Sequence, residues 1–237
     1  MGNLLQKATP VIILIAVCGA LIGGIAWMMN GGTNGAEVRL VDTDQSLPGP
    51  LAANELAAYN VNIISDMNPI AVLNTNKGVI EIELFENQMP ITAGNFAKLV
   101  GEDFYNGIKF HRVIEGFMVQ GGDPTTKTEE TLRYGTGGPG YSIPDEHIKS
   151  DLLTNIRGTI SMANSGPNSG GSQFFINLVD NTNLDFDKTP VSSQHPVFGR
   201  VIKGMEVVDE ISRLETSATG LPLDVVTIES ATIKRES

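Results

Sequence analysis

Two segments mix aromatic and aliphatic side chains with hydrogen-bonding groups more densely than packing alone would require. One runs from Phe110 to Asp123 (FHRVIEGFMVQGGD), and the other runs from Ser161 to Ile176 (SMANSGPNSGGSQFFI). Covalent catalysis needs a nucleophile beside an activating base, and neither segment offers that pair. The serines also lack the G-x-S-x-G context of a serine hydrolase. The two segments are therefore candidates for a site that works by binding and hydrogen bonding.

Short strands must position these segments. Residues 78–85 (GVIEIELF) alternate, with aliphatic side chains on one face and two glutamates on the other. This pattern is typical of a half-buried antiparallel strand, which we expect to pair with residues 70–75 across the turn at Asn76-Lys77-Gly78. Further short apolar runs that we expect to form strands cover residues 110–114, 117–120, 159–163, 173–178, 197–202 and 224–233.

Two stretches show helical spacing of apolar residues instead. They are residues 90–100, where Pro90 suits a first-turn position, and residues 205–214. Seven or eight short strands with two helices and abundant glycine predict a mainly β fold. The expected architecture is an antiparallel barrel or sandwich with capping helices.

The two candidate segments resemble the most diagnostic stretches of the cyclophilins. Further matching pieces follow in order at residues 105–107 (YNG), 195–199 (HPVFG) and 204–208 (GMEVV), and the resemblance spans about residues 70–235. An extended loop ends in GTGGPGYSIPDE, which is similar to some prokaryotic members. The resemblance implies an eight-stranded antiparallel cyclophilin-like β-barrel capped by two α-helices. It also implies peptidyl-prolyl cis/trans isomerase activity without a cofactor.

The resemblance implies a catalytic role for four residues. Arg112 would supply a fixed positive charge near the prolyl nitrogen and carbonyl as the amide loses conjugation, and Gln120 would orient Arg112. Phe117 and His195 would line the pocket for the proline ring. An electrostatic site of this kind favours the twisted state of the bond over either planar isomer.

Further residues would bind the substrate around the same groove. The resemblance implies this role for Met118, Ala163, Asn164, Ser165, Gln173, Phe175 and Leu184. Ser165 stands where many relatives have alanine. Asn183 falls where many relatives have a tryptophan that is associated with tight cyclosporin binding, so we expect weak cyclosporin binding. The segment after Leu184 is longer than in common members, and Phe186 could take over part of the pocket lining.

Each of these residues also has an ordinary structural interpretation. Arg112 could be an exposed or ion-paired arginine, Phe117, Met118 and Phe175 could be core residues, and His195 could lie on the surface. The alternative function is a non-catalytic proline-peptide binding or scaffolding module that uses the same groove. The matching arginine, glutamine, phenylalanine and histidine favour the enzyme.

A long apolar run precedes this domain. No charged side chain lies between Ala8 and Gly35, and residues 10–29 are almost wholly apolar. A helix of about 20 residues spans about 30 Å, the thickness of a bilayer core, so we expect a transmembrane anchor. A secretory signal, which would give a cleaved and secreted form, is the alternative. Lys7 before the run and Glu37 after it place the N-terminus in the cytoplasm.

The sequence thus divides into four parts. They are a cytoplasmic N-terminus at 1–9, an anchor or signal segment at 10–29, a linker at 30–68 and an isomerase domain at 69–237. The domain is expected outside the cytoplasm, in the periplasm or on the cell surface. Its expected partners are proline-containing polypeptides, with the membrane bound through the N-terminal helix, and the chain is expected to be a monomer.

Composition and motifs oppose several other functions. The net charge is −11, with 16 basic against 27 acidic residues, which opposes nucleic-acid binding. The single cysteine, Cys18, lies in the apolar run and leaves the domain without a disulfide or a cysteine metal site. Residues 135–140 (GTGGPG) match G-x-G-x-x-G, but they lack a preceding strand and a following helix, so we expect no dinucleotide. Asp145-Glu146-His147 is interpreted as a solvated turn rather than a metal site.

Overall fold

The first hairpin of the structure follows from the alternating residues around position 80. Strand β1 (Ile70–Thr75) pairs antiparallel with β2 (Gly78–Leu84), from Ile70 opposite Glu83 to Thr75 opposite Gly78. Ile80, Ile82 and Leu84 of β2 are fully buried, and its two glutamates remain partly exposed. One of these, Glu83, accepts from Arg200 Nε at 2.8 Å on the neighbouring strand.

The computed structural model describes residues 68–190 and 194–235, and residues from Asn68 onward form one compact unit. The expected anchor, and all but the last residue of the expected linker, lie outside the described residues. Among the residues that are described, no helix combines the length and the apolar character needed to cross a membrane.

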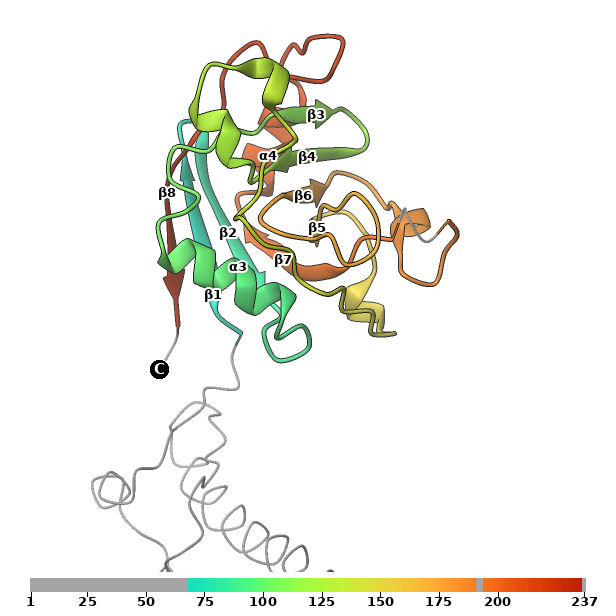
Figure 1. The fold of residues 1–237 in the computed structure, drawn as a ribbon. Coiled ribbons are helices and arrows are strands. Elements are labelled where there is room, and N and C mark those ends of the chain that lie inside the picture. The colour runs from blue at the N-terminus through green and yellow to red at the C-terminus, as the bar shows by residue number, and fades with distance from the viewer. Residues whose placement is uncertain (1–67, 191–193, 236–237) are drawn as a thin grey trace, which may run out of the picture. The chain divides into compact units, whose positions relative to one another are not determined.

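The described residues form an eight-stranded antiparallel sheet in the order β3-β4-β6-β5-β7-β2-β1-β8. The strands not yet named are β3 (Arg112–Ile114), β4 (Met118–Gly121), β5 (Thr159–Met162), β6 (Phe174–Asn177), β7 (Val197–Lys203) and β8 (Ile228–Lys234). Figure 1 shows how the sheet curls. Main-chain hydrogen bonds join the two ends of the sheet. They link the segment before β3 to the start of β8 and the residues that precede it: Phe110 N donates to Val226 O at 2.9 Å, and Ile228 N donates to Ile108 O at 2.8 Å.

Two α-helices, α3 (Thr92–Gly101) and α4 (Met205–Ser212), pack against this sheet within the described residues. Helix α3 contacts β7 and β8, and α4 contacts β2, β3 and β4. Phe96 of α3 lies at the centre of the core, with ring centroids 4.8 Å from Tyr105 and 5.4 Å from Phe174. The predicted mainly β fold, with eight antiparallel strands and two helices, is confirmed.

The helix predicted from residue 90 begins two residues later. A carboxylate from a distant loop accounts for this start, because Glu146 accepts from Ile91 N at 3.0 Å and from Thr92 N at 2.6 Å. The helix N-terminus leaves main-chain N–H groups without partners inside the helix, and a carboxylate there satisfies them. The interpretation of residues 145–147 as a solvated turn is therefore wrong for Glu146, which is half-buried and caps α3.

Candidate active site

Strand register brings three of the predicted site residues into one row. Arg112 on β3 lies opposite Gln120 on β4, and Gln120 lies opposite Phe175 on β6. Directly opposed residues of paired strands project from the same face of a sheet. Their chain neighbours Val119 and Phe174 point to the other face and belong to the main core. The three residues therefore share the outer face of the curled sheet.

A small apolar cluster, which we call the outer cluster, lies on this face. It consists of Met118, Phe175 and Leu184, with Phe117 and Ala163 packed against it. It is separate from the main core, although Met118 is only 1% exposed and Phe175 only 5%. An apolar cluster outside the core, next to polar groups that converge on it, is the usual composition of a ligand site.

The guanidinium of Arg112 lies beside this cluster on an exposed edge of the sheet. Its Nη1 donates to Gln120 Oε1 at 3.2 Å. In the described part of the chain, no carboxylate forms an ion pair with Arg112. The positive charge is thus held in place by a neutral amide, which orients it without cancelling it.

The side chain of Gln173 extends this arrangement away from Arg112. Gln120 Nε2 donates to Gln173 Oε1 at 3.0 Å. Gln173 Nε2 in turn donates to the carbonyls of Gly135 at 3.0 Å and Gly137 at 2.9 Å. One continuous chain of hydrogen bonds therefore links Arg112, Gln120 and Gln173. We call it the amide chain, and it ends on the glycine-rich loop at residues 135–140.

The imidazole of His195 closes another side of the outer cluster. Its ring stands edge-on to Phe175 with centroids 5.3 Å apart at 85°. The ring atom Nδ1 lies 3.1 Å from Met162 O, so a neutral ring carries its proton on Nδ1. Burial lowers the pKa of His195 below its ordinary value of 6.5, which favours the neutral ring at pH 7.

Three predicted substrate-binding residues follow β5. Ala163 N donates to Gln173 O at 3.0 Å, and Asn164 Nδ2 donates to Gln194 O at 2.9 Å. Ser165 is exposed, and its main-chain N donates to Ser169 Oγ at 2.9 Å. The side-chain nitrogen of Asn164 is thus used within the protein, where it ties this segment to the residue before His195.

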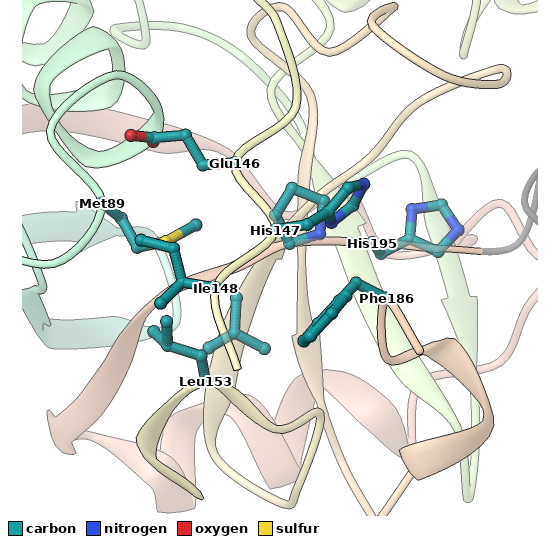
Figure 2. A pocket seen from close by; sticks show the side chains of 9 residues that line it. Met89, Glu146, His147, Ile148, Leu153, Phe186 and His195 are labelled. Carbon is teal, nitrogen blue, oxygen red and sulfur yellow. The ribbon is translucent and has the colours of Figure 1, made fainter. Parts of the chain in front are cut away.

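Leu184 and its neighbours Asn183 and Phe186 lie in different environments. Leu184 ends a short 3-10 helix, η5 (Thr182–Leu184), and is buried in the outer cluster, whereas Asn183 is exposed. Phe186 does not join this cluster and instead stacks on His147, with centroids 5.7 Å apart at 21°. Figure 2 shows His147 and Phe186 beside His195 in a small neighbouring pocket. Phe186 thus lies outside the outer cluster, and a part for it in the lining of the proline pocket stays a prediction.

A buried polar network beneath the outer cluster was not anticipated from the sequence. Asn155, Ser161 and Asn177 are fully buried, and Asn155 Oδ1 accepts from Ser161 Oγ at 2.6 Å and from Asn177 Nδ2 at 3.2 Å. Asn181 Nδ2 donates to Phe117 O at 3.0 Å. The spacing of these asparagines does not mark them, because they come together only when the paired strands β5 and β6 meet the segments at Asn155 and Asn181.

Comparison with known proteins agrees with this geometry. A profile of the family described as cyclophilin type peptidyl-prolyl cis-trans isomerase/CLD matches residues 70–233. A peptidyl-prolyl cis-trans isomerase of Acinetobacter baylyi is 44% identical over 172 residues, which are 70% of this chain and 86% of that protein. The human peptidyl-prolyl cis-trans isomerase-like 3 is 43% identical over 166 residues, which are 68% of this chain and 93% of that protein.

Solved structures lead to the same family. The crystal structure of a cyclophilin type peptidyl-prolyl cis-trans isomerase of Cryptosporidium parvum has a TM-score of 0.61 at 30% identity, covering 72% of this chain and 99% of that chain. A second structure of that protein, in the presence of the dipeptide Ala-Pro, has a TM-score of 0.60 at 30% identity, covering 70% and 99%. The chain described here therefore belongs to the cyclophilin type peptidyl-prolyl cis-trans isomerases.

Proposed function

We propose that this isomerase acts on proline-containing polypeptides outside the cytoplasm and assists their folding, with Arg112 as its catalytic charge. One observation carries the catalytic role. The uncompensated guanidinium of Arg112, held by Gln120 at 3.2 Å, lies on the same sheet face as the outer cluster. A charge next to an apolar cluster is the pair of features that the reaction requires.

The reaction is slow without a catalyst because of amide resonance. The C–N bond has partial double-bond character, and its rotation barrier is about 18–20 kcal/mol. As the bond twists, conjugation is lost and the lone pair returns to the prolyl nitrogen. A groove that binds this twisted state better than either planar isomer lowers the barrier. No covalent bond breaks, so the reaction needs neither a nucleophile nor a cofactor.

Each part of the groove then has a role in this reaction. The outer cluster receives the pyrrolidine ring, with His195 closing its side. Arg112 donates to the prolyl nitrogen and its carbonyl as the lone pair localises, and Gln120 holds the guanidinium in that position. The peptide backbone lies along the segment that follows β5 and beside the amide chain, with contacts from Ala163, Asn164, Ser165 and Gln173.

The catalytic role is tested by NMR exchange on an Ala-Pro peptide with the full-length protein and Arg112→Ala. We expect a loss of at least about 10-fold in the exchange rate, equivalent to about 1.4 kcal/mol. Arg200→Ala is the matched control, because Arg200 is exposed on β7 and paired with Glu83. Peptide binding without exchange in the wild-type protein would make the chain a proline-recognition module instead.

The proposed location is supported by the sequence of residues 1–37. The uncharged apolar run at 10–29 matches a bilayer in length, and Lys7 precedes it. We propose that this run anchors a monomeric domain of the prokaryotic type. The loop ending in GTGGPGYSIPDE is what supports the prokaryotic type.

Reporter fusions test the location. Alkaline phosphatase forms its disulfides only in an oxidising compartment, so its fusion after Ser237 should be active in a bacterial host. Leu14→Arg with Leu21→Arg should abolish that activity, since each central arginine costs about 2.5–3.5 kcal/mol on insertion. Leu51→Arg, outside the run, is the control. An inactive wild-type fusion would place the domain in the cytoplasm.

A further inference from the structure

The glycine-rich loop at residues 135–140 has a structural role that its resemblance to a nucleotide-binding motif conceals. It is built around the carboxylate of Asp123, which is 0% exposed. Asp123 Oδ1 accepts from Thr125 N at 2.7 Å and Thr125 Oγ1 at 2.8 Å. Asp123 Oδ2 accepts from Gly135 N at 2.5 Å and from Gly137 N at 3.2 Å.

Glycine is required where the loop passes this carboxylate. A Cβ atom at Gly137 would lie 2.2 Å from Asp123 Oδ1 and 2.7 Å from Thr125 Cγ2. Gly135 has φ +87°, a backbone conformation that residues other than glycine rarely adopt. The two glycines and the buried carboxylate therefore fix the path of the loop together.

The loop in turn sets the direction of the amide chain that ends on Arg112. The carbonyls of Gly135 and Gly137 can only accept, so Gln173 must turn its nitrogen toward them. Its oxygen then faces Gln120, which must donate with its own nitrogen and is left with an oxygen for Arg112. With the loop in this place, only this orientation of both amides satisfies every group.

We propose that Asp123 is a positioning residue for Arg112. It holds the Gly135 and Gly137 carbonyls where they orient the Gln173 and Gln120 amides, so that Arg112 always meets an acceptor. Without the carboxylate, Gln173 is able to flip its amide, and Gln120 then presents a donor to the guanidinium, which is repelled from its place. This inference rests on the proposed catalytic role of Arg112.

The test is a double-mutant cycle on the full-length protein, with Asp123→Asn and Arg112→Ala alone and combined. Asparagine has nearly the same shape but places an NH₂ group against N–H donors. We expect Asp123→Asn to lower kcat/KM on the order of 10-fold in the wild-type background, mainly through kcat. In the Arg112→Ala background it should lower kcat/KM less than about twofold, because the residue that it positions is absent.

A control variant and a milder variant complete the cycle. Asp180→Asn alters another carboxylate that accepts a main-chain N–H, from Arg157 at 3.0 Å, away from the amide chain, and should leave kcat/KM unchanged. Thr125→Val removes one donor to Asp123 at constant size. It should give a smaller loss with the same dependence on Arg112, and it decides the question if Asp123→Asn does not fold.

The outcomes separate the two proposals. Equal losses from Asp123→Asn in both backgrounds would mean a purely structural role and would overturn this inference. No loss from Asp123→Asn, beside a clear loss from Arg112→Ala, would overturn it as well. If Arg112→Ala itself has no effect, the proposed catalytic role fails first. As an independent measurement, the side-chain NH₂ signals of Gln173 should shift in Asp123→Asn and stay in place in Asp180→Asn.

Discussion

The side-chain nitrogen of Asn155 donates to the main-chain oxygen of His195 at 3.1 Å, from 40 residues away in the chain. The same nitrogen donates to Asp185 Oδ1 at 3.0 Å, and the main-chain N of Asn155 donates to that oxygen at 2.7 Å. Asp185 directly follows Leu184. One buried asparagine thus ties together the two segments that carry Leu184 and His195 into the outer cluster.

Removal of this asparagine should loosen both segments. We expect Asn155→Ala to lower the free energy of unfolding by about 1–3 kcal/mol, because Ser161 and Asn177 lose a buried acceptor. It should also lower kcat/KM, since Leu184 and His195 lose their shared support. Urea unfolding and peptide exchange measure the two effects. Asn74→Ala, which removes a hydrogen bond to Ser230 on the distant pair β1–β8, should affect stability alone.

The adjacent phenylalanines of β6 should affect different properties when they are shortened. Phe174 is fully buried in the main core, so Phe174→Ala should cost about 3–5 kcal/mol of stability. Phe175 belongs to the outer cluster, so Phe175→Ala should cost less stability but raise KM for a proline peptide strongly. Thermal unfolding and peptide titration compare them. Equal stability losses with unchanged binding by Phe175→Ala would contradict the pocket assignment.

Stability should fall as the pH drops below about 6.5. Burial lowers the pKa of His195 and of His111 from 6.5, although the nearby Asp123 carboxylate partly opposes the shift for His111. Between the lowered pKa and 6.5, the unfolded chain binds more protons than the folded one, so the free energy of unfolding rises with pH there. Each histidine contributes a slope of at most about 1.4 kcal/mol per pH unit.

Urea unfolding between pH 5 and pH 7.5 measures this dependence. His111→Gln and His195→Gln should each flatten the curve, whatever they do to its height. A wild-type stability that stays constant from pH 7.5 to pH 5 would show that neither ring is held neutral by burial.

The cap on α3 should stabilise the helix in a charge-dependent way. Glu146→Ala removes the acceptor for Ile91 N and Thr92 N and should cost about 0.5–2 kcal/mol. Glu146→Gln keeps one acceptor and should cost less. Hydrogen exchange at Ala93 and Asn95, in the first turn, measures the local opening. Unchanged exchange in both variants would show that the cap does not stabilise α3.

The sequence was most informative where a periodic pattern meets a buried surface. Strand β1 has the predicted bounds, and β2 ends only one residue earlier than predicted. The prediction is close because alternation fixes which residues of a strand face the core. Helix α4 ends at Ser212 rather than at residue 214, since Leu214 N donates to Ile211 O in a tighter final turn. Such end effects depend on local hydrogen bonds, which periodicity does not report.

The site was predictable only in part for a related reason. Arg112, Gln120 and Phe175 lie in motifs continuous in the chain, and their common face follows from the pairing of β3, β4 and β6. Glu146 and Asn155 act on groups 54 and 40 residues away, and a single sequence gives no measure of such proximity. The stacking of Phe186 on His147 is likewise a contact between distant parts of the chain.

The pairing of β1 with β8 affects how the protein folds during its synthesis. Asn74 and Ser230, which are hydrogen-bonded across this pair, lie 156 residues apart. A ribosome that adds about 5–20 residues per second therefore makes β8 roughly 8–30 s after β1. Until then the first hairpin has an open edge and an uncovered apolar face, which invite aggregation. For those seconds the newly made isomerase is itself an incompletely folded polypeptide with an exposed strand edge.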